Sequence, residues 1–596
     1  MAASPRDQAD GVFRLSVKSG GQALAETIEF VSVSVNRTVN AIPYARLVIL
    51  DGDMPGQTFP LSEKDAFKPG AVINISAGYG DQESTIFEGI VVRHGIKITG
   101  ANDARLVIEC RDKAVAMTVG RKNVNYVDKK DSDILQAVVG SYSSLTSDIG
   151  ATTLKHKELV QYYCTDWDFA LARAEANGFL VIVEDGKFIA KPPQVNAAAE
   201  LKVAYGADLI ELHGDIDART QYSKVKASAW DQKTQAVIES TSSPQTLNEQ
   251  GNLASGTLAQ VIGLSEFRLQ TPVPLVQDAL ATWAKAQQIK SALARVRGRM
   301  KFQGSALAKA GSLIELAGVG ARFNGKVFVS AVHHDIADGD WITEVEFGLA
   351  PDWMMARGDV MAPDASGLLP GVRGLQVGVV TKLDADPEGE SRVQVRVPVM
   401  QAEKDTVWAR LVNFYGSSGF GAYFIPEIGD EVLLGYLNGD PSHPVILGSL
   451  YSSKRAPPYP LSAENNTKAI VTRSKTKIEI NDDKKIITIQ TPANNKVVIS
   501  DDGKSILLQD QTNNKVELNS GGITLDSPKD IKITAKGAIT LDAVGAISVT
   551  SKADVKSSGL NVNCDAQVGF AAKGAASAEI SASGTTTVKG AMVMIN

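Results

Sequence analysis

The sequence predicts a mainly β homotrimer with an α+β hub, a small barrel and a C-terminal intertwined triple-stranded β-helix. Three observations lead to this fold class. An eight-residue apolar repeat runs from Ile523 to Val555, and several short strand-like runs fill residues 371–451. Residues 11–349 alternate strand-like runs with a few helical stretches. The chain therefore divides into a hub, a barrel and a needle.

The eight-residue repeat carries the prediction of a trimer. Each unit pairs two apolar positions on one face of a short strand and ends in a turn. Burying two aliphatic side chains does not offset the entropy of ordering eight residues, so a unit cannot fold alone. Eight residues are too few for one chain to close a coil, and a lone antiparallel meander would leave an apolar face and two edges in water. We therefore expect three chains to complete each rung of a triangular prism. The predicted core residues are Ile523, Leu525, Ile531, Ile533, Ile539, Leu541, Ile547 and Val549.

The far end of the repeat predicts a docking surface. After Val562 the sequence is rich in Ala, Gly, Ser and Thr, which predicts a thin end, and it then finishes with apolar residues. Open ends of stacked repeats are normally covered by a cap. We expect a small capping protein to bind three copies of Met592, Val593, Met594 and Ile595. The alternatives are a terminal strand that only closes the prism, or a flexible low-complexity tail.

Whole-chain properties exclude several classes of protein. The 596 residues carry a net charge of −6, which provides no basic surface for nucleic acid. No run of 18 apolar residues occurs, and the first ten residues lack the apolar core of a signal peptide. Three dispersed cysteines form neither a disulfide framework nor a zinc motif. These features predict cytoplasmic synthesis without a signal peptide.

Composition and periodicity predict the domain boundaries. Helical spacing predicts helices over 131–142, 166–177 and 275–296, with a hairpin around Glu184-Asp-Gly186. Gly, Pro, Asp and Ser mark two breaks in the chain. The predicted order is a hub with two barrel subdomains and helices (1–356), a linker (357–370), an OB-type barrel (371–451), a spacer (452–472) and the needle (473–596).

Two motifs in the barrel resemble a known family. The segments Gly421–Val432 (GAYFIPEIGDEV) and Gly439–Tyr451 (GDPSHPVILGSLY) are similar to the OB domain of VgrG-type spike proteins of contractile injection systems, either phage-tail-like particles or type VI secretion. The resemblance extends through most of the chain. It also covers Trp408-Ala-Arg410, Phe87–Gly89, Thr165–Phe169 and Arg322–Lys326.

The resemblance implies a trimeric hub and spike. Two related barrels per chain would give the trimer six faces that seat a hexameric inner tube protein, among other baseplate proteins. The barrel and needle would point toward the target membrane, which they contact transiently, and a small PAAR-like protein would cap the tip. From the short spacer and the end at Asn596 we expect neither a lysozyme domain nor an effector domain. The particle would be delivered extracellularly on contraction.

No residue pattern predicts chemistry. Of the six histidines, only His333-His334-Asp335 suggests a site, and neighbouring strand residues point to opposite faces, which disfavours a metal clamp. Asp482-Asp483 and Asp501-Asp502 fall at predicted turns. We therefore expect no catalytic, cofactor-binding or metal-binding residues, no enzyme activity, and a mechanical role in which sheath contraction drives a stiff prism through the target envelope.

Two other functions stay open. A trimeric adhesin or carbohydrate-binding tail fibre would also use an intertwined prism, although such fibres end in an aromatic-bearing head. A spike-borne glycan hydrolase would need paired acids in a groove flanked by aromatic residues. The sequence does not separate a released particle from a cell-anchored system, and it identifies neither target, cargo nor tip protein.

Overall fold

The computed structural model describes residues 2–100, 103–402 and 404–595. The chain forms two compact units that divide between Leu450 and Tyr451. The outermost residues of the predicted hub and needle, Met1 and Asn596, lie outside the described residues. The mainly β fold class predicted from the sequence is confirmed.

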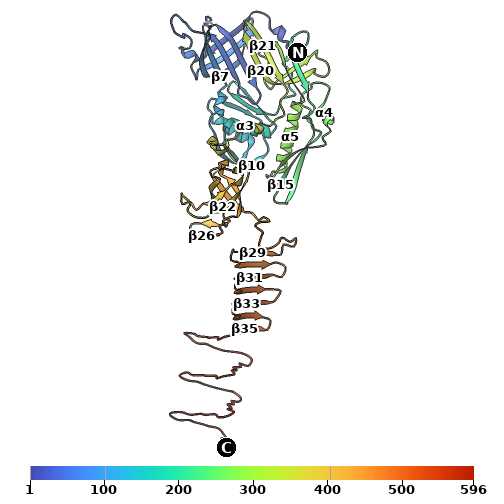
Figure 1. Ribbon diagram of the computed structural model, residues 1–596. Helices are drawn as coiled ribbons and strands as arrows, with labels where there is room; N and C mark the ends of the chain where they lie inside the picture. The colour runs from blue at the N-terminus through green and yellow to red at the C-terminus, as the bar shows by residue number, and fades with distance from the viewer. Residues whose placement is uncertain (1, 101–102, 403, 596) are drawn as a thin grey trace. The chain divides into compact units, whose positions relative to one another are not determined.

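The first unit contains one 13-stranded sheet whose two halves enclose separate cores. In the first half, drawn in blue in Figure 1, the order is β3-β4-β7-β6-β5-β1-β2. Phe67, Phe87, Ile73 and Ile75 are fully buried in its core. Its strands are β1 (Phe13–Ser19), β2 (Gln22–Ala23), β3 (Phe30–Thr38), β4 (Tyr44–Leu50), β5 (Val72–Tyr79), β6 (Gln82–Ile98) and β7 (Ala104–Arg111). Along the chain, the short helix α1 (Pro5–Gln8) precedes β1, η1 (Asp65–Phe67) lies between β4 and β5, and η2 (Lys113–Thr118) follows β7.

The second half of the sheet comes from residues about two hundred positions later. Its strands are β13 (Leu201–Ala204), β14 (Leu209–Ile216), β18 (Val296–Gln303), β19 (Leu313–Ala317), β20 (Gly325–Ala337) and β21 (Asp340–Phe347). Antiparallel pairing of β20 with β3 joins the halves, with Ala331 opposite Thr38 and Ala337 opposite Ser32. The two halves are therefore one continuous hydrogen-bonded sheet.

Two insertions carry the longer helices of the hub. Thr165 caps the first turn of α3 by accepting a hydrogen bond from the Asp168 N–H, and Gly178, with φ of 68°, follows the helix end. The predicted helices and the hairpin are confirmed to within a few residues. The first insertion holds β8 (Lys122–Lys130), α2 (Asp131–Gly140), β9 (Thr146–Ile149), β10 (Lys155–Cys164), α3 (Asp166–Ala176), β11 (Leu180–Glu184) and β12 (Lys187–Lys191). The second holds β15 (Val225–Asp231), β16 (Ala236–Ser242), α4 (Ser255–Ile262), β17 (Phe267–Thr271) and α5 (Gln277–Leu293).

A closed five-stranded barrel follows the hub. Its order is β22-β23-β24-β28-β27, around a core that includes Val380, Val395, Leu434 and Ile446. The strands are β22 (Gln376–Lys382), β23 (Val393–Arg396), β24 (Thr406–Leu411), β27 (Glu431–Tyr436) and β28 (Pro444–Ser449), with a small hairpin of β25 (Gly416–Ser417) and β26 (Phe420–Gly421) and short helices η5 (Pro398–Met400) and η6 (Leu437–Gly439).

The segment predicted as a linker packs against its neighbours. Residues 354–367 contain η3 (Met354–Ala356) and η4 (Asp364–Gly367). Val360 is buried in the core of the first insertion, and Asp364 pairs with Arg373 at 2.8 Å. Asn438 of the barrel donates a hydrogen bond to Ser366. Residues 357–370 thus have fixed contacts with both the hub and the barrel.

The second unit opens with a seven-stranded antiparallel meander. Its strands pair in chain order: β29 (Thr467–Val471), β30 (Lys477–Asn481), β31 (Ile486–Gln490), β32 (Lys496–Ser500), β33 (Ser505–Gln509), β34 (Lys515–Asn519) and β35 (Gly522–Asp526). Asn494 and Asn513, in two of the connecting turns, adopt φ of 67° and 68°. We expected a strand in every eight-residue unit through Val555, but strand pairing within the chain ends at β35. Beyond it, no described segment of this chain supplies the backbone partners that a strand requires.

Among the described residues, none of the helices has both the length and the apolar character needed to cross a membrane.

Candidate functional site

The meander presents one face made of two columns of aliphatic side chains. Strand register fixes these columns, because residues paired across an antiparallel sheet lie on the same face. Pairs such as Ile478 with Ile489 and Val516 with Leu525 continue one column. The first column contains Ile480, Ile487, Ile499, Ile506, Leu518 and Ile523, and the second contains Ile470, Ile478, Ile489, Val497, Leu508, Val516 and Leu525.

This aliphatic face is left open by the single chain. Ile489 is 46% exposed and Leu508 is 45% exposed, although both belong to regular strands. A groove of about 670 Å³ follows the second column and reaches Ile531. An exposed apolar face of this length marks a protein interface.

The eight-residue spacing continues in the chain beyond the meander. Residues 527–595 bend at 528–529, 536–537, 544–545 and 552–553, and Figure 1 shows this segment as a zigzag trace. The next bend, at 559–560, comes after seven residues, and the spacing then returns to eight. A chain that contributes one strand per rung to a prism of several chains needs regular bends and has no strand partner within itself. Residues 527–595 fit this description.

The predicted core residues of the needle lie on this open part of the chain. Ile523 and Leu525 belong to β35, and the other six follow it. Within one chain their exposed fractions run from 55% for Ile531, Ile539 and Ile547 to 73% for Ile523 and Leu541. The single chain does not bring them together, so their contacts across three copies stay a prediction.

The four predicted tip residues are also open to solvent. Met592, Val593, Met594 and Ile595 are 80%, 50%, 84% and 90% exposed. No side chain of the described chain covers this apolar run. The binding of a cap there stays a prediction.

One histidine of the pair in β20, His334, has a packing role. His334 is buried between Trp341 and Thr343, and its Nδ1 lies 3.0 Å from the Thr343 hydroxyl. Burial, followed by the positive charges of Arg37 and His333, lowers the pKa of His334 to about 3. Within residues 2–100, 103–402 and 404–595, no group of three His, Cys, Asp or Glu side chains is placed to hold a metal ion.

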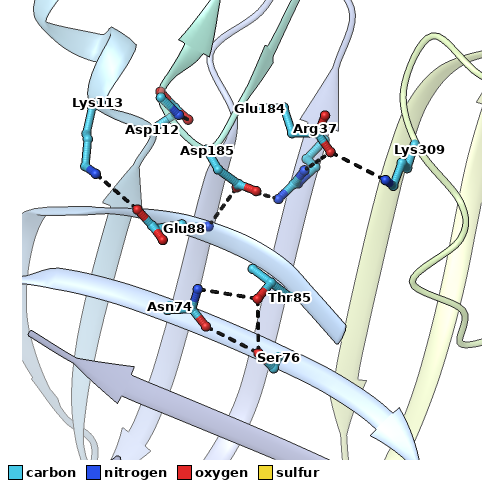
Figure 2. A network of polar contacts seen from close by, with 11 residues as sticks. Arg37, Asn74, Ser76, Thr85, Glu88, Asp112, Lys113, Glu184, Asp185 and Lys309 are labelled. Carbon is cyan, nitrogen blue, oxygen red and sulfur yellow. Dashed lines mark hydrogen bonds and ion pairs between the residues drawn. The ribbon is translucent and has the colours of Figure 1, made fainter. Parts of the chain in front are cut away.

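A polar network ties the first insertion to the sheet (Figure 2). Arg37 of β3 contacts Asp185, in the turn between β11 and β12, at 2.8 Å and Glu184, the last residue of β11, at 3.5 Å. The Glu88 N–H of β6 donates to Asp185 at 3.2 Å, and Lys113 pairs with the Glu88 side chain at 3.0 Å. These contacts fasten the hairpin turn to two strands of the first sheet half.

The same network reaches the second sheet half. Lys309, which precedes β19, lies 3.8 Å from Glu184. Asp112 accepts hydrogen bonds from the Gly186 and Ala114 N–H groups at 2.8 Å each. Burial raises the pKa of both Asp112 and Asp185 above its usual value. The first insertion and both sheet halves are therefore held as one body.

A cluster of exposed aromatic side chains on the barrel was not predicted. The segment between β24 and β27 exposes Phe414, Tyr415, Phe420, Tyr423 and Phe424. The sequence signal was present, because five aromatic residues fall within eleven positions that contain no charged residue. In the sequence this segment was recognised only as part of a family motif, and the structure was needed to show that its aromatic side chains are exposed.

Three family models match the chain. The Alg8 N-terminal domain matches residues 9–338, which is more than half of the chain. The injector OB domain of type VI secretion systems and phage baseplates matches residues 376–451, and the phage baseplate V C-terminal trimerisation domain matches residues 485–596. The chain belongs to the Alg8 N-terminal domain family and is a VgrG-type spike protein. The trimerisation model covers the part of this spike protein whose aliphatic face is open.

Curated relatives of the spike protein include the type VI secretion system spike protein VgrG5 of Pseudomonas aeruginosa, 36% identical over 108 residues, or 17% of this chain and 14% of the relative. The actin cross-linking toxin VgrG1 of Vibrio cholerae is 35% identical over 96 residues, or 14% of this chain and 9% of the toxin. The chain thus aligns with less than a fifth of the length of either protein. A tail protein of prophage MuSo2 from Shewanella oneidensis superposes with a TM-score of 0.43 at 11% identity, covering 57% of this chain and 98% of that one.

Proposed function

We propose that three copies of this chain form the hub and spike of a contractile injection machine, in which the needle pierces the target envelope and the hub joins it to the inner tube. The open aliphatic face of the meander is the observation that carries this proposal. The described residues of the chain do not cover its two columns, and the matching family model is a trimerisation domain.

Three-fold symmetry accounts for both parts of the needle. Three meanders that turn their columns inward make a triangular prism whose interior is aliphatic and whose outer face carries residues such as Glu479, Glu517 and Lys515. Beyond β35, the unpaired backbone of each chain finds its hydrogen-bond partners in the other two. Cyclic symmetry closes the assembly at three copies.

The role we propose is mechanical. A prism resists buckling because bending it requires rungs of three chains to separate together. The hub is suited to bear the reaction force, since its sheet is continuous and the Arg37 network fixes the first insertion to it. Catalysis has no part in this proposal.

The proposed partners follow from the parts of the machine. Two sheet halves per chain give six sites around a trimer, which suits a hexameric inner tube protein and the surrounding baseplate. A small PAAR-like protein caps residues 592–595, and the assembled particle acts outside the cell that makes it. The membrane of the target is contacted only during contraction.

Mass in solution tests the proposal directly. Static light scattering on the purified full-length chain is expected to give about three times the chain mass of 63.2 kDa. A stable monomer at micromolar concentration contradicts the proposal, because the aliphatic columns would then lack their partner. A trimer that forms equally well when the needle residues carry charges contradicts the placement of the interface.

A further inference from the structure

The exposed aromatic side chains of the barrel lie on a well-formed segment, the aromatic hairpin, which spans residues 412–426. Its center is the β25–β26 pair, and the Ala422 N–H donates to the Tyr415 carbonyl at 2.8 Å. Gly419, with φ of 79°, makes the turn. At its end Ile425 packs into the barrel core. The backbone of the hairpin is thus anchored to the barrel.

The rings themselves face solvent. Phe414 and Tyr423 are 87% and 85% exposed, and Tyr415, Phe420 and Phe424 are between 56% and 62% exposed. No charged residue occurs between Leu411 and Pro426. With about 200 Å² for a whole aromatic side chain, the exposed rings amount to roughly 700 Å². A surface of this size and composition is typical of an interface.

A second apolar surface lies on the outside of the same barrel, on strands β22, β27 and β28. Val377 and Leu433 are paired across β22 and β27 and point outward. Leu447 of β28 lies over Gly435 of β27, with a methyl carbon 3.4 Å from the position a Cβ would take there. Val377 is 40% exposed and Leu447 is 46% exposed. We call this surface the outer barrel face.

We propose that the aromatic hairpin of one copy docks on the outer barrel face of the next copy, so that the three barrels form a closed ring of contacts. This inference rests on the proposed trimer and adds an interface to it. Each copy contributes one hairpin and one face, which is the head-to-tail arrangement that closes under cyclic symmetry.

Two further observations favor a second copy over another occupant. The barrel is joined to the trimerisation domain by a short segment, since β28 ends at Ser449 and β29 begins at Thr467. This tether holds three barrels at high effective concentration once the needle has assembled. The exposed rings offer up to roughly 700 Å² on one partner, which approaches the area of about 800 Å² per partner in a standard interface.

Cross-linking in the full-length trimer tests the proposal. Tyr423→Cys is combined with Leu447→Cys in a background carrying Cys164→Ser and Cys564→Ser, and the protein is treated with a short bis-maleimide. The expected product is a covalent trimer on a denaturing gel. The matched control combines Tyr423→Cys with Asp81→Cys, whose second position lies in the turn between β5 and β6 of the hub and is 97% exposed.

Light scattering on the same samples separates the two ideas. A monomeric sample defeats the proposed trimer itself. A trimeric sample that forms no more covalent trimer than the control overturns the docking of the hairpin and leaves the needle trimer standing. Trimers that fail to cross-link but bind neutral phosphatidylcholine vesicles through Phe414 and Tyr423 overturn it in favor of a membrane contact.

A second variant links the cross-link to the rings. Adding Phe414→Ser and Phe420→Ser to the reporter pair is expected to lower the yield of covalent trimer about fivefold, because central aromatic residues dominate interfaces. Both side chains face solvent in the single chain, so the barrel keeps its fold. An unchanged yield overturns the assignment of these rings to the contact.

Discussion

The hub and the needle contain the same kind of strand, with one apolar face, but differ in what covers that face. In the hub, Ile73 and Ile75 alternate along β5 and are fully buried by their own chain. In the needle, Ile523 and Leu525 alternate along β35 and are 73% and 57% exposed. The local pattern is the same in both, so alternation identifies a strand with one apolar face and does not say which chain covers that face.

The two regions also differ in how far apart their pairing residues lie in the sequence. In the hub, β3 pairs with β20 about three hundred residues later, whereas each needle strand pairs with the next one along the chain. The hub therefore buries its core by a folding event within one molecule. The needle needs an encounter between molecules, and its stability should depend on protein concentration.

The largest effect is expected from a charge on the predicted needle axis. Ile531→Asp places three carboxylates together, and each buried charge costs at least a few kcal/mol. We expect the dissociation constant of the trimer to rise by roughly four orders of magnitude. Light scattering over a concentration series measures this change.

The matched control for that variant is Val544→Asp, at a bend where the side chain is fully exposed. It should leave the trimer mass unchanged. Equal loss of trimer in both variants would show that charge anywhere on the needle is disruptive and would remove Ile531 from the core.

A cavity in the hub should lower the stability of the hub and leave the assembly of the trimer unchanged. Phe87→Ala removes a fully buried ring and is expected to cost about 3–5 kcal/mol in the free energy of unfolding of the hub. The trimer mass should stay the same below the unfolding temperature, since the needle does not use this core. Calorimetry alongside light scattering measures both, and Val12→Ala, 78% exposed, is the control.

An acidic unfolding step in the hub should depend on Asp131. Its carboxylate lies 2.7 Å from Arg173 Nε and 3.0 Å from His156 Nε2. Burial raises the pKa of Asp131, but the Arg173 guanidinium, with Asn177 and His156, holds the pKa below the ordinary 3.8. Folding thus favors the ionised form, and the stability it contributes is present above pH 3.8 and is lost as pH falls through the lower folded value.

Asp131→Asn is therefore expected to destabilise the hub by about 3 kcal/mol at neutral pH, because it leaves Arg173 without its charged partner. The difference from the natural chain should shrink as pH falls below 3.8. Thermal unfolding measured from neutral to acidic pH checks this, with the exposed Asp10→Asn as the control. A difference that stays constant with pH would contradict it.

The smallest effect is expected at the tip. Deleting residues 592–595 should change neither the trimer mass nor the melting temperature of the needle measurably, because these side chains are 50–90% exposed. Circular dichroism melts and light scattering measure both quantities. A clear loss of needle stability would mean that these residues close the prism, which was the alternative to a docking surface.

Sequence patterns predicted the fold class, the hub helices and the barrel because each depends on local periodicity and turn residues. The helix at Asp166 begins at a capping Thr165 and is followed by Gly178, so its ends were readable. The pairing of β3 with β20 was not readable, since nothing local links residues 32–38 to residues 331–337. The within-chain meander before Ile523 was also missed, because the repeat argument was built on the shorter units that follow it.

The predicted needle residues show what a single chain can and cannot establish. Ile531 was chosen from spacing alone, and the structure places it beside the open groove. The contact of Ile531 with the other two copies of the chain stays a prediction. The aromatic hairpin differs from the needle residues. Its sequence was recognised as a motif, but the exposure of its side chains depends on how Ile425 anchors the segment to the barrel.

The ladder between β3 and β20 has a consequence for how a sudden load travels. Seven residue pairs, from Ala331 with Thr38 to Ala337 with Ser32, connect the two sheet halves edge to edge. A force parallel to these strands loads all seven residue pairs at once, so no pair separates before the others. Such a force applied to one sheet half would therefore be transmitted almost completely to the other half.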